Sequence, residues 1–263
     1  MSLREPLAAI ARAIDVAQRK ARVRLLVEPQ VRRRGMQLDP DVFRGRRVAI
    51  VGPAETVRDE TASVDLDAYD LIVRLNNGIA LAEAEPETFG RRTDILFHNL
   101  KEEGERSAGA IPASRLRANG TRLCVYPHRG AKSTLKRAFA KDREWTEAPD
   151  LRMAVPDLAF CLALEDALDG YKPTAGASAI LVALAGRPRE LAIFGFTFFE
   201  TPYAAGYNDA VDSAEAARAW VAVHGVHDPR REKALVRQRL EAARAKGTII
   251  TLGAEVERRL MDR

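Results

Sequence analysis

A histidine and a carboxylate late in the chain, His227 and Glu232, have the spacing H-x-x-x-x-E. Between them, Asp228 and Pro229 are typical of a helix start, with Asp as the N-cap and Pro at the first helical position. His227 then lies just outside the helix, where an imidazole with an ordinary pKa near ~6.5 suits general-base chemistry at neutral pH. The alternative interpretation is a helix cap beside an incidental surface histidine.

A second candidate site is the segment Lys172-Pro173-Thr174-Ala175-Gly176, which precedes a small apolar helix. A hydroxyl and a glycine at a helix start offer backbone N–H groups and the positive end of the helix dipole to an anion. Ordinary capping by Thr174 explains the same residues, so both interpretations stay open on composition alone.

Gly52 and Asn76 each follow a short apolar run of the kind expected for a buried parallel strand. Ligands of open parallel sheets bind beyond the carboxyl ends of the strands. A glycine there admits close approach to the backbone, and an asparagine can donate to a phosphate oxygen or pair with a base edge. The alternative for Asn76 is a simple turn through Asn77 and Gly78.

Several common functions lack their sequence signatures. Gly52 opens no GxGxxG fingerprint and the chain contains no GxxxxGK[ST], so a dinucleotide enzyme and a P-loop ATPase are disfavoured. Asp65 and Asp67 spell DxD, a pair that holds a metal in many sugar transferases, but we expect no metal here. His98 and His128 are weaker candidates for a site, and the four histidines lack the spacing of a zinc site.

The candidate site residues must be positioned by strands and helices, and strand-like and helix-like segments alternate along the chain. This alternation predicts an α/β fold: a single Rossmann-like domain with a mainly parallel sheet flanked by helices, plus an N-terminal helical arm. We expect the arm at residues 1–45 and the catalytic domain at 46–263. The predicted strands are Val48–Val51, Leu71–Leu75, Ile95–His98, Leu123–Tyr126, Leu191–Phe194 and Thr248–Leu252; the clearest helices are Ala175–Ala185 and Pro229–Ala245.

The basic charge is concentrated in the arm. Residues 1–47 carry twelve Lys or Arg and five Asp or Glu, a surplus of seven, whereas the whole chain has a net charge of +5. Apolar residues spaced three and four apart predict a helix over residues 3–28, followed by a linker at 32–35. The helix either packs on the domain or lies on an anionic membrane surface. A nucleic-acid-binding module is disfavoured, because it needs a basic face on the domain itself.

The location of the protein is predicted from what the sequence lacks. No stretch reaches the roughly 18 apolar residues of a membrane span, and the N-terminus has no apolar signal region. Cys124 and Cys161 lie in apolar segments and are expected to be buried, inert thiols. We therefore expect a cytoplasmic protein, with peripheral contact at the inner membrane face as the alternative for the arm.

The run from VAIVG through DLDAYDLIVRLN to FGRRTD resembles the large motif of the sialyltransferases, glycosyltransferase family 29. P-T-x-G, an apolar helix and I-F-G-F resemble the small motif, and H-x-x-x-x-E resembles the very small motif. In that family the large motif binds CMP, the small motif contacts donor and acceptor, and the last histidine is the general base. The sequence departs from the pattern at Pro53, which replaces an asparagine and lacks a backbone N–H.

A further family element, a short His-Tyr motif that assists the departing phosphate, is reduced here to Tyr207 without the histidine. His224 lies near the very small motif at a spacing that does not match. The family disulfide cannot form, since neither cysteine lies at its positions, in agreement with a reducing compartment.

The resemblance implies a bacterial, metal-independent inverting transferase that moves a sialic acid from its CMP-activated donor to a hydroxyl of a glycan or glycolipid. His227 and Glu232 are the implied catalytic residues; Gly52, Asn76, Thr174, Gly176 and Tyr207 are the implied CMP-binding residues; the CMP-sugar is a substrate and no cofactor is expected. Kdo is the alternative sugar, because it is also a CMP-linked ulosonic acid. A non-catalytic CMP-sugar-binding relative is the alternative of another class.

Overall fold

The computed structural model describes residues 14, 17–104, 107–130, 135–222 and 225–261. Its centre is a parallel sheet of seven strands in the order β5-β4-β3-β2-β1-β6-β7. The strands are β1 Arg47–Val51, β2 Leu71–Leu75, β3 Ile95–Phe97, β4 Leu123–Val125, β5 Arg152–Ala154, β6 Glu190–Phe194 and β7 Ile249–Leu252. The predicted fold class is confirmed, and all six predicted strands are present within one residue at each end. The short edge strand β5 was not predicted.

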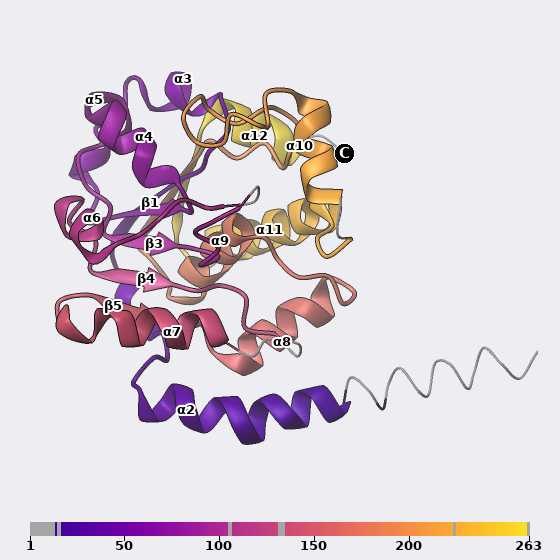
Figure 1. Cartoon of the computed structure of the whole chain (residues 1–263). Helices are drawn as coiled ribbons and strands as arrows, with labels where there is room; N and C mark the ends of the chain where they lie inside the picture. The colour runs from indigo at the N-terminus through magenta and orange to yellow at the C-terminus, as the bar shows by residue number, and fades with distance from the viewer. Residues whose placement is uncertain (1–13, 15–16, 105–106, 131–134, 223–224, 262–263) are drawn as a thin grey trace, which may run out of the picture.

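Helices cover both faces of the sheet (Figure 1). They are α3 Val57–Thr61, α4 Gly78–Ala84, α5 Pro86–Phe89, α6 Ala113–Ala118, α7 Lys136–Glu144, α8 Leu158–Ala167, α9 Ala175–Ala185, α10 Ala214–Ala222, α11 Pro229–Arg244 and α12 Ala254–Met261. Alternate residues of β1 face opposite layers: Val48 and Ile50 share a core with α9 and α11, whereas Ala49 and Val51 share one with α3 to α5. Burial on both faces explains why the strands read as continuous apolar runs.

The N-terminal arm packs on the domain as one continuous helix below α7 and α8 (Figure 1). It comprises helical residues 17–22, a wider π-helical turn at Val23–Val27 and α2 Glu28–Arg33. The wide turn precedes Pro29, whose ring cannot fit a regular helical turn. The helix therefore continues through part of the predicted linker, and residues 1–13 and 15–16 of the predicted arm lie outside the described part.

Apolar side chains of the arm belong to the core. Val23, Val27 and Val31 pack in one cluster with residues of α7 and α8, and Glu28 forms an ion pair with the fully buried Arg129. The chain then runs beside β5, where the Leu38 N–H donates to the Val155 carbonyl at 2.9 Å. These contacts support the interpretation of the arm as a packing helix. The division into an arm at residues 1–45 and a catalytic domain at 46–263 stays a prediction.

The order of the strands fixes where a ligand can bind. From β1 the chain proceeds through β2, β3, β4 and β5 on one side and then returns to β6 and β7 on the other. The connections leaving β1 and β6 therefore diverge at the carboxyl end of the sheet, and a crevice forms at such a switch point. Within the described residues, no helix is long and apolar enough to cross a membrane.

Candidate active site

A cleft opens at the switch point between β1 and β6. It comprises a cavity of about 320 Å³ and a smaller one of about 100 Å³ that share Asn76, Thr174, Ala175, Phe199, Tyr203 and Tyr207 in their walls. We call the two together the inner cleft. Of the seven predicted site residues, the structure brings Asn76, Thr174, Gly176, Tyr207, Glu232 and His227 to its walls. Their roles stay predictions, but their convergence supports a common site.

The ring of His227 is fixed by a backbone carbonyl. Its Nδ1 lies 2.6 Å from the carbonyl oxygen of Lys172, and the Lys172 N–H donates to the Val226 carbonyl at 2.8 Å. Because a carbonyl oxygen only accepts, Nδ1 carries the proton, and in the neutral ring Nε2 then carries the lone pair. Asp228 caps the following helix α11 as predicted, with its carboxylate accepting from the Arg230 and Arg231 N–H groups. The imidazole is therefore held in the tautomer that a general base needs.

Glu232 does not contact His227 by a hydrogen bond. Its Oε1 lies 3.8 Å from His227 Nδ1, whereas its two oxygens accept from the N–H and the hydroxyl of Thr174 at 2.9 and 2.7 Å. Burial raises the pKa of Glu232 to about 8, although the hydrogen bonds from Thr174 oppose that shift. Glu232 thus clamps the start of α9, and this clamp holds the loop that carries Lys172 beside His227.

The ring of Phe196 explains why positions 52 and 176 are both glycine. A Cβ on Gly52 would lie 2.7 Å from the ring of Phe196 and 2.3 Å from the Gly195 carbonyl, and a Cβ on Gly176 would lie 2.7 Å from the same ring. Both positions need glycine because β1 and α9 close on Phe196 from either side. Pro53 and Ala54 line the inner cleft immediately beyond Gly52. Gly52 therefore has a packing role that the sequence did not reveal.

Asn76 adopts a left-handed conformation (φ 48°), which asparagine tolerates better than most residues. Its Oδ1 accepts from the Asn99 N–H at 3.1 Å, so its amide group is left to hydrogen-bond the Tyr207 hydroxyl. Burial raises the pKa of Tyr207 to about 12. The neighbouring Asn77 donates to the Tyr207 carbonyl at 3.1 Å. Consecutive amides after β2 therefore position both the ring and the backbone of Tyr207.

The other residues of the large motif build a scaffold away from the cleft. Arg74 is almost fully buried and donates to the Thr93 hydroxyl at 3.0 Å and to the Phe89 carbonyl. Burial lowers the pKa of Arg74 to about 10, still well above neutrality. Asp70 accepts from the Arg47 N–H at 2.7 Å and so ties β2 to β1. Of the segment DLDAYDLIVRLN, only Leu75 and Asn76, at its carboxyl end, line the inner cleft.

Asp65 and Asp67 lie before β2, at the end of the sheet opposite the cleft. Asp65 caps a short 3-10 turn by accepting from the Asp67 N–H, and Asp67 accepts from Arg91 N–H and Arg92 Nη1. Both carboxylates therefore have structural partners. No group of His, Cys, Asp or Glu in the described ranges is arranged to hold a metal ion.

The other histidines are poor bases. His98 is fully buried between the Ala108 carbonyl and the Leu100 N–H, and burial lowers its pKa to about 4. His128 lines the inner cleft 6.3 Å from His227 between ring centroids, and burial together with nearby positive charge lowers its pKa to about 3. His224 lies outside the described residues.

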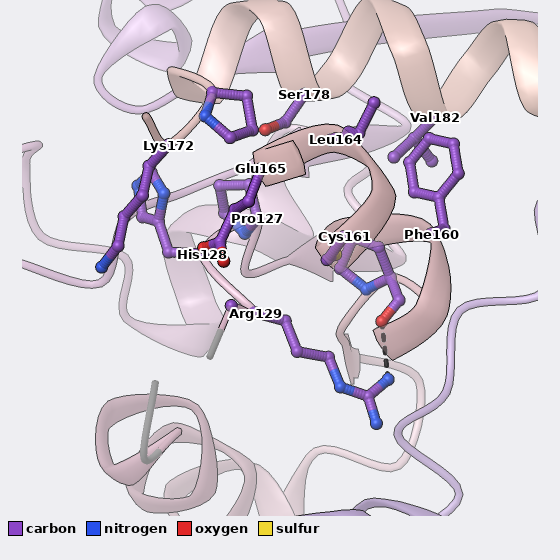
Figure 2. Close-up of a pocket in the computed structure, with 13 residues that line it drawn as sticks. Pro127, His128, Arg129, Phe160, Cys161, Leu164, Glu165, Lys172, Ser178 and Val182 are labelled. Atoms are coloured by element: carbon purple, nitrogen blue, oxygen red, sulfur yellow. Dashed lines mark hydrogen bonds between the residues drawn. The ribbon is translucent and has the colours of Figure 1, made fainter. Parts of the chain in front are cut away.

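Figure 2 shows the region behind His128, where Lys172 lies beside its ring and Arg129 donates to the Pro156 carbonyl. The cavity here is only about 10 Å³, room for one water molecule at most. Cys161 lines it, and burial raises the pKa of this thiol to about 12. Both cysteines are free and buried, which confirms the prediction that they are buried.

Sequence reasoning missed two lysines near the site. Lys172 is the residue whose carbonyl holds His227 and whose charge acts on His128. Lys101 lines the inner cleft from the loop after β3, next to Asn99. Only the places of the two lysines in the sequence could have indicated a role in the site. Lys172 lies just before the predicted helix cap, and Lys101 lies just after the end of a predicted strand.

No protein-family model matches the sequence, and no curated protein matches it either. Solved structures do match. A mammalian sialyltransferase in complex with Gal-beta-1-3GalNAc-ortho-nitrophenol has a TM-score of 0.51 at 16% identity, over 90% of this chain and 85% of that chain. The sialyltransferase CstII from Campylobacter jejuni, in complex with CMP-3FNeuAc, has a TM-score of 0.47 at 15% identity, over 79% of this chain and 81% of that chain. The mammalian match shows that the chain has a Rossmann-like sialyltransferase fold.

Proposed function

We propose that the protein is an inverting glycosyltransferase that moves an ulosonic acid, sialic acid in the first instance, from its CMP-activated donor to a hydroxyl of a glycan or glycolipid. The observation that carries the proposal is His227 at the wall of the inner cleft, held by the Lys172 carbonyl in the tautomer of a base. The order of the three sequence motifs and the shared fold support the same assignment.

The reaction is a direct displacement. His227 Nε2 takes the proton of the acceptor hydroxyl while the acceptor oxygen forms a bond to the anomeric carbon of the donor. The bond from that carbon to the CMP phosphate oxygen breaks, and its electron pair leaves with CMP. Attack from the face opposite the phosphate inverts the anomeric centre.

The departing phosphate would lie at the start of α9. The first N–H groups of a helix and its dipole stabilise an anion, and Thr174, Ala175 and Gly176 of that turn line the inner cleft. Tyr207, whose high pKa keeps its hydroxyl protonated, would donate to a phosphate oxygen. Because these donors neutralise a single phosphate, the reaction needs no metal in this proposal.

The donor carries two anionic groups, the sugar carboxylate and the phosphate. Lys101 supplies positive charge in the wall of the inner cleft, and Lys172 supplies it behind His128, which lines the same cleft. Sialic acid and Kdo both meet this requirement, so the sugar is identified by presenting each CMP-sugar to the protein and measuring CMP release.

The test is a nucleotide panel in a thermal unfolding assay. CMP at ~100 times its dissociation constant should add about 2.7 kcal/mol to the free energy of unfolding, whereas UDP, GDP and NAD should add little. Equal stabilisation by UDP contradicts the proposal. CMP binding without CMP release from any CMP-sugar and acceptor pair would instead identify a non-catalytic binding protein.

A further inference from the structure

A second concavity lies on the other side of His227, and we call it the outer groove. It has a volume of about 1070 Å³ and shares His227, Phe198, Phe199 and Val221 with the inner cleft. The other lining residues on which the argument depends are Tyr171, Glu200, Arg230, Lys233, Arg237 and Arg259. A substrate in the outer groove can therefore present a group to the same imidazole that faces the inner cleft.

One wall of the outer groove is a basic stripe on α11. Arg230, Lys233 and Arg237 follow the i, i+3, i+7 spacing that places side chains on one helix face. The opposite face carries Leu235 and Val236, which are buried against the sheet. Burial of the apolar face therefore fixes the rotation of α11 about its own axis, so that the basic stripe faces the groove.

The charge of the groove is not balanced by its own carboxylates. Its lining contains five basic side chains and two acidic ones. Lys233 and Arg259 share Glu200, at 3.4 and 2.5 Å. Arg230 and Arg237 form no ion pair with any carboxylate of the described residues. Arg237 donates a long hydrogen bond of 3.4 Å from one guanidinium nitrogen to the Leu260 carbonyl. Neither guanidinium group has its charge neutralised by a carboxylate, and guanidinium groups bind carboxylate and phosphate in a bidentate geometry.

Part of the groove is lined by aromatic side chains, those of Phe198, Phe199 and Tyr171. Phe198 and Phe199 follow β6 and both have left-handed backbone angles, φ 52° and 66°, which bulky residues adopt only rarely. The ring of Tyr171 packs against the guanidinium group of Arg231. Aromatic faces pack against the apolar faces of sugar rings, so this part of the groove fits a saccharide.

We propose that the outer groove binds the acceptor, and that the acceptor is an anionic glycan whose carboxylate or phosphate group contacts Arg230 and Arg237. This inference rests on the proposed function, because it takes the inner cleft as the donor site and His227 as the base between the two. The aromatic residues hold the sugar that carries the reacting hydroxyl, and the basic stripe on α11 holds the charge further out. A nucleic acid fits less well, since a concave site of this kind offers no extended basic track.

The test measures acceptor binding to the CMP-saturated protein by titration calorimetry. The probes are lactose, sialyllactose as the carboxylate form and lactose phosphate as the phosphate form. We expect at least one charged probe to bind roughly tenfold more tightly than lactose at low salt, and the preference to shrink as salt rises. The stronger of the two charged probes identifies the anion.

The matched variants have equal changes in charge. Arg230→Glu with Arg237→Glu should abolish the preference for the charged probe and leave lactose binding within about twofold. The control is Arg46→Glu with Arg189→Glu, two exposed arginines at the opposite end of the sheet, before β1 and β6. The control pair should keep the preference.

Each outcome decides the inference. Equal binding of charged and neutral probes, no binding of either charged probe, or a preference that survives Arg230→Glu with Arg237→Glu overturns it. CMP binding is measured first on the same samples and reports on the proposed function separately. A protein that binds CMP but shows no charge preference retains its proposed function and loses only the anionic acceptor.

Discussion

Both carboxylate oxygens of Glu232 accept hydrogen bonds from Thr174, although the two residues lie 58 positions apart. Thr174 is also the N-cap of α9, since its hydroxyl accepts from the Ala177 N–H. One buried carboxylate therefore joins the start of α11 to the start of α9. The same contact keeps Lys172, two residues before Thr174, where its carbonyl meets His227.

The buried carboxyl of Glu232 should make stability depend on pH. Its pKa is raised to about 8 from an ordinary 4.5, so the folded protein retains a proton that the unfolded chain loses between these values. The contribution of this proton to the free energy of unfolding is full below pH 4.5 and is lost as the pH rises through 8. A difference of one between the folded and unfolded pKa values corresponds to about 1.4 kcal/mol. Glu232→Gln should flatten this decline, measured as the urea unfolding free energy across that range.

Glu241→Gln is the control for this measurement, because Glu241 is exposed on the same helix. It should leave the decline of stability with pH unchanged. If Glu232→Gln shows the same decline as the unmodified protein, Glu232 is ionised in the folded state and the clamp on Thr174 is a charged one.

His227→Ala should reduce transfer by ~10²–10⁴-fold, the usual contribution of a general base. The affinity for CMP should change by less than about twofold, because the base acts on the acceptor hydroxyl and not on the nucleotide. Activity of the unmodified protein should fall at acid pH as the imidazole is protonated, and the residual activity of the variant should lack this fall. Transfer rates with a CMP-sugar and CMP calorimetry give both quantities.

His128→Asn is the comparison for the base, since His128 lines the inner cleft near His227 but has a pKa of about 3. Its loss should reduce transfer by less than about tenfold. If His128→Asn abolishes transfer while His227→Ala does not, the H-x-x-x-x-E segment is a helix cap and the proposed mechanism fails.

Tyr207→Phe should lower kcat by about 10–100-fold with little change in KM for the acceptor. The change removes the hydroxyl that would donate to the phosphate, together with its hydrogen bond to Asn76, while the edge-on contact of the ring with Tyr203 remains. Tyr203→Phe removes a hydroxyl from the other ring of this pair and should cost less. Equal losses in the two variants would show that neither hydroxyl has a special role.

Contact with an anionic membrane was the alternative for the arm, and within the described residues it would involve the exposed side of the helix. Leu25 and Leu26 are 73% and 58% exposed and stand beside Arg22 and Arg24, whereas Val23 is buried. Leu25→Glu with Leu26→Glu should abolish flotation with anionic vesicles and leave the melting temperature unchanged.

Val23→Glu is the contrasting variant for the arm, because it places a carboxylate in the core and should lower the melting temperature. Truncating the arm after residue 30 is a less selective experiment. It removes Val23 and Val27 and leaves Arg129 as a buried charge without Glu28, a change that typically costs about 3–5 kcal/mol. Unchanged flotation of the double leucine variant would contradict the membrane prediction.

Chelation should leave turnover unchanged. The Asp65 and Asp67 carboxylates are occupied by backbone and arginine donors at the end of the sheet opposite the cleft. Helix-end N–H groups and Tyr207 would neutralise the single phosphate instead. CMP release is measured with and without EDTA; a loss of rate that Mg²⁺ or Mn²⁺ restores would contradict this expectation and favour a metal site.

The sequence by itself determined the elements and the end of the sheet at which a site would form. Apolar runs located six of the seven strands, and the caps at Thr174 and Asp228 located the starts of α9 and α11. Such signals are local, since burial of a strand and the capping of a helix depend on residues a few positions apart. The edge strand β5, Arg152–Ala154, begins with an exposed arginine and contains no branched or aromatic residue, so it gives no such pattern.

Only the tertiary structure decided what the motif residues contact. Glu232 was expected to be catalytic together with His227, and the fold joins it to Thr174 by hydrogen bonds. Gly52 was expected at the nucleotide, and the fold packs it against Phe196. These partners lie far apart in the chain, so their pairing depends on how α9 and α11 pack on the sheet. Neither the periodicity of the apolar residues nor the spacing of the motif residues predicts that packing. The same packing also creates the outer groove beside His227.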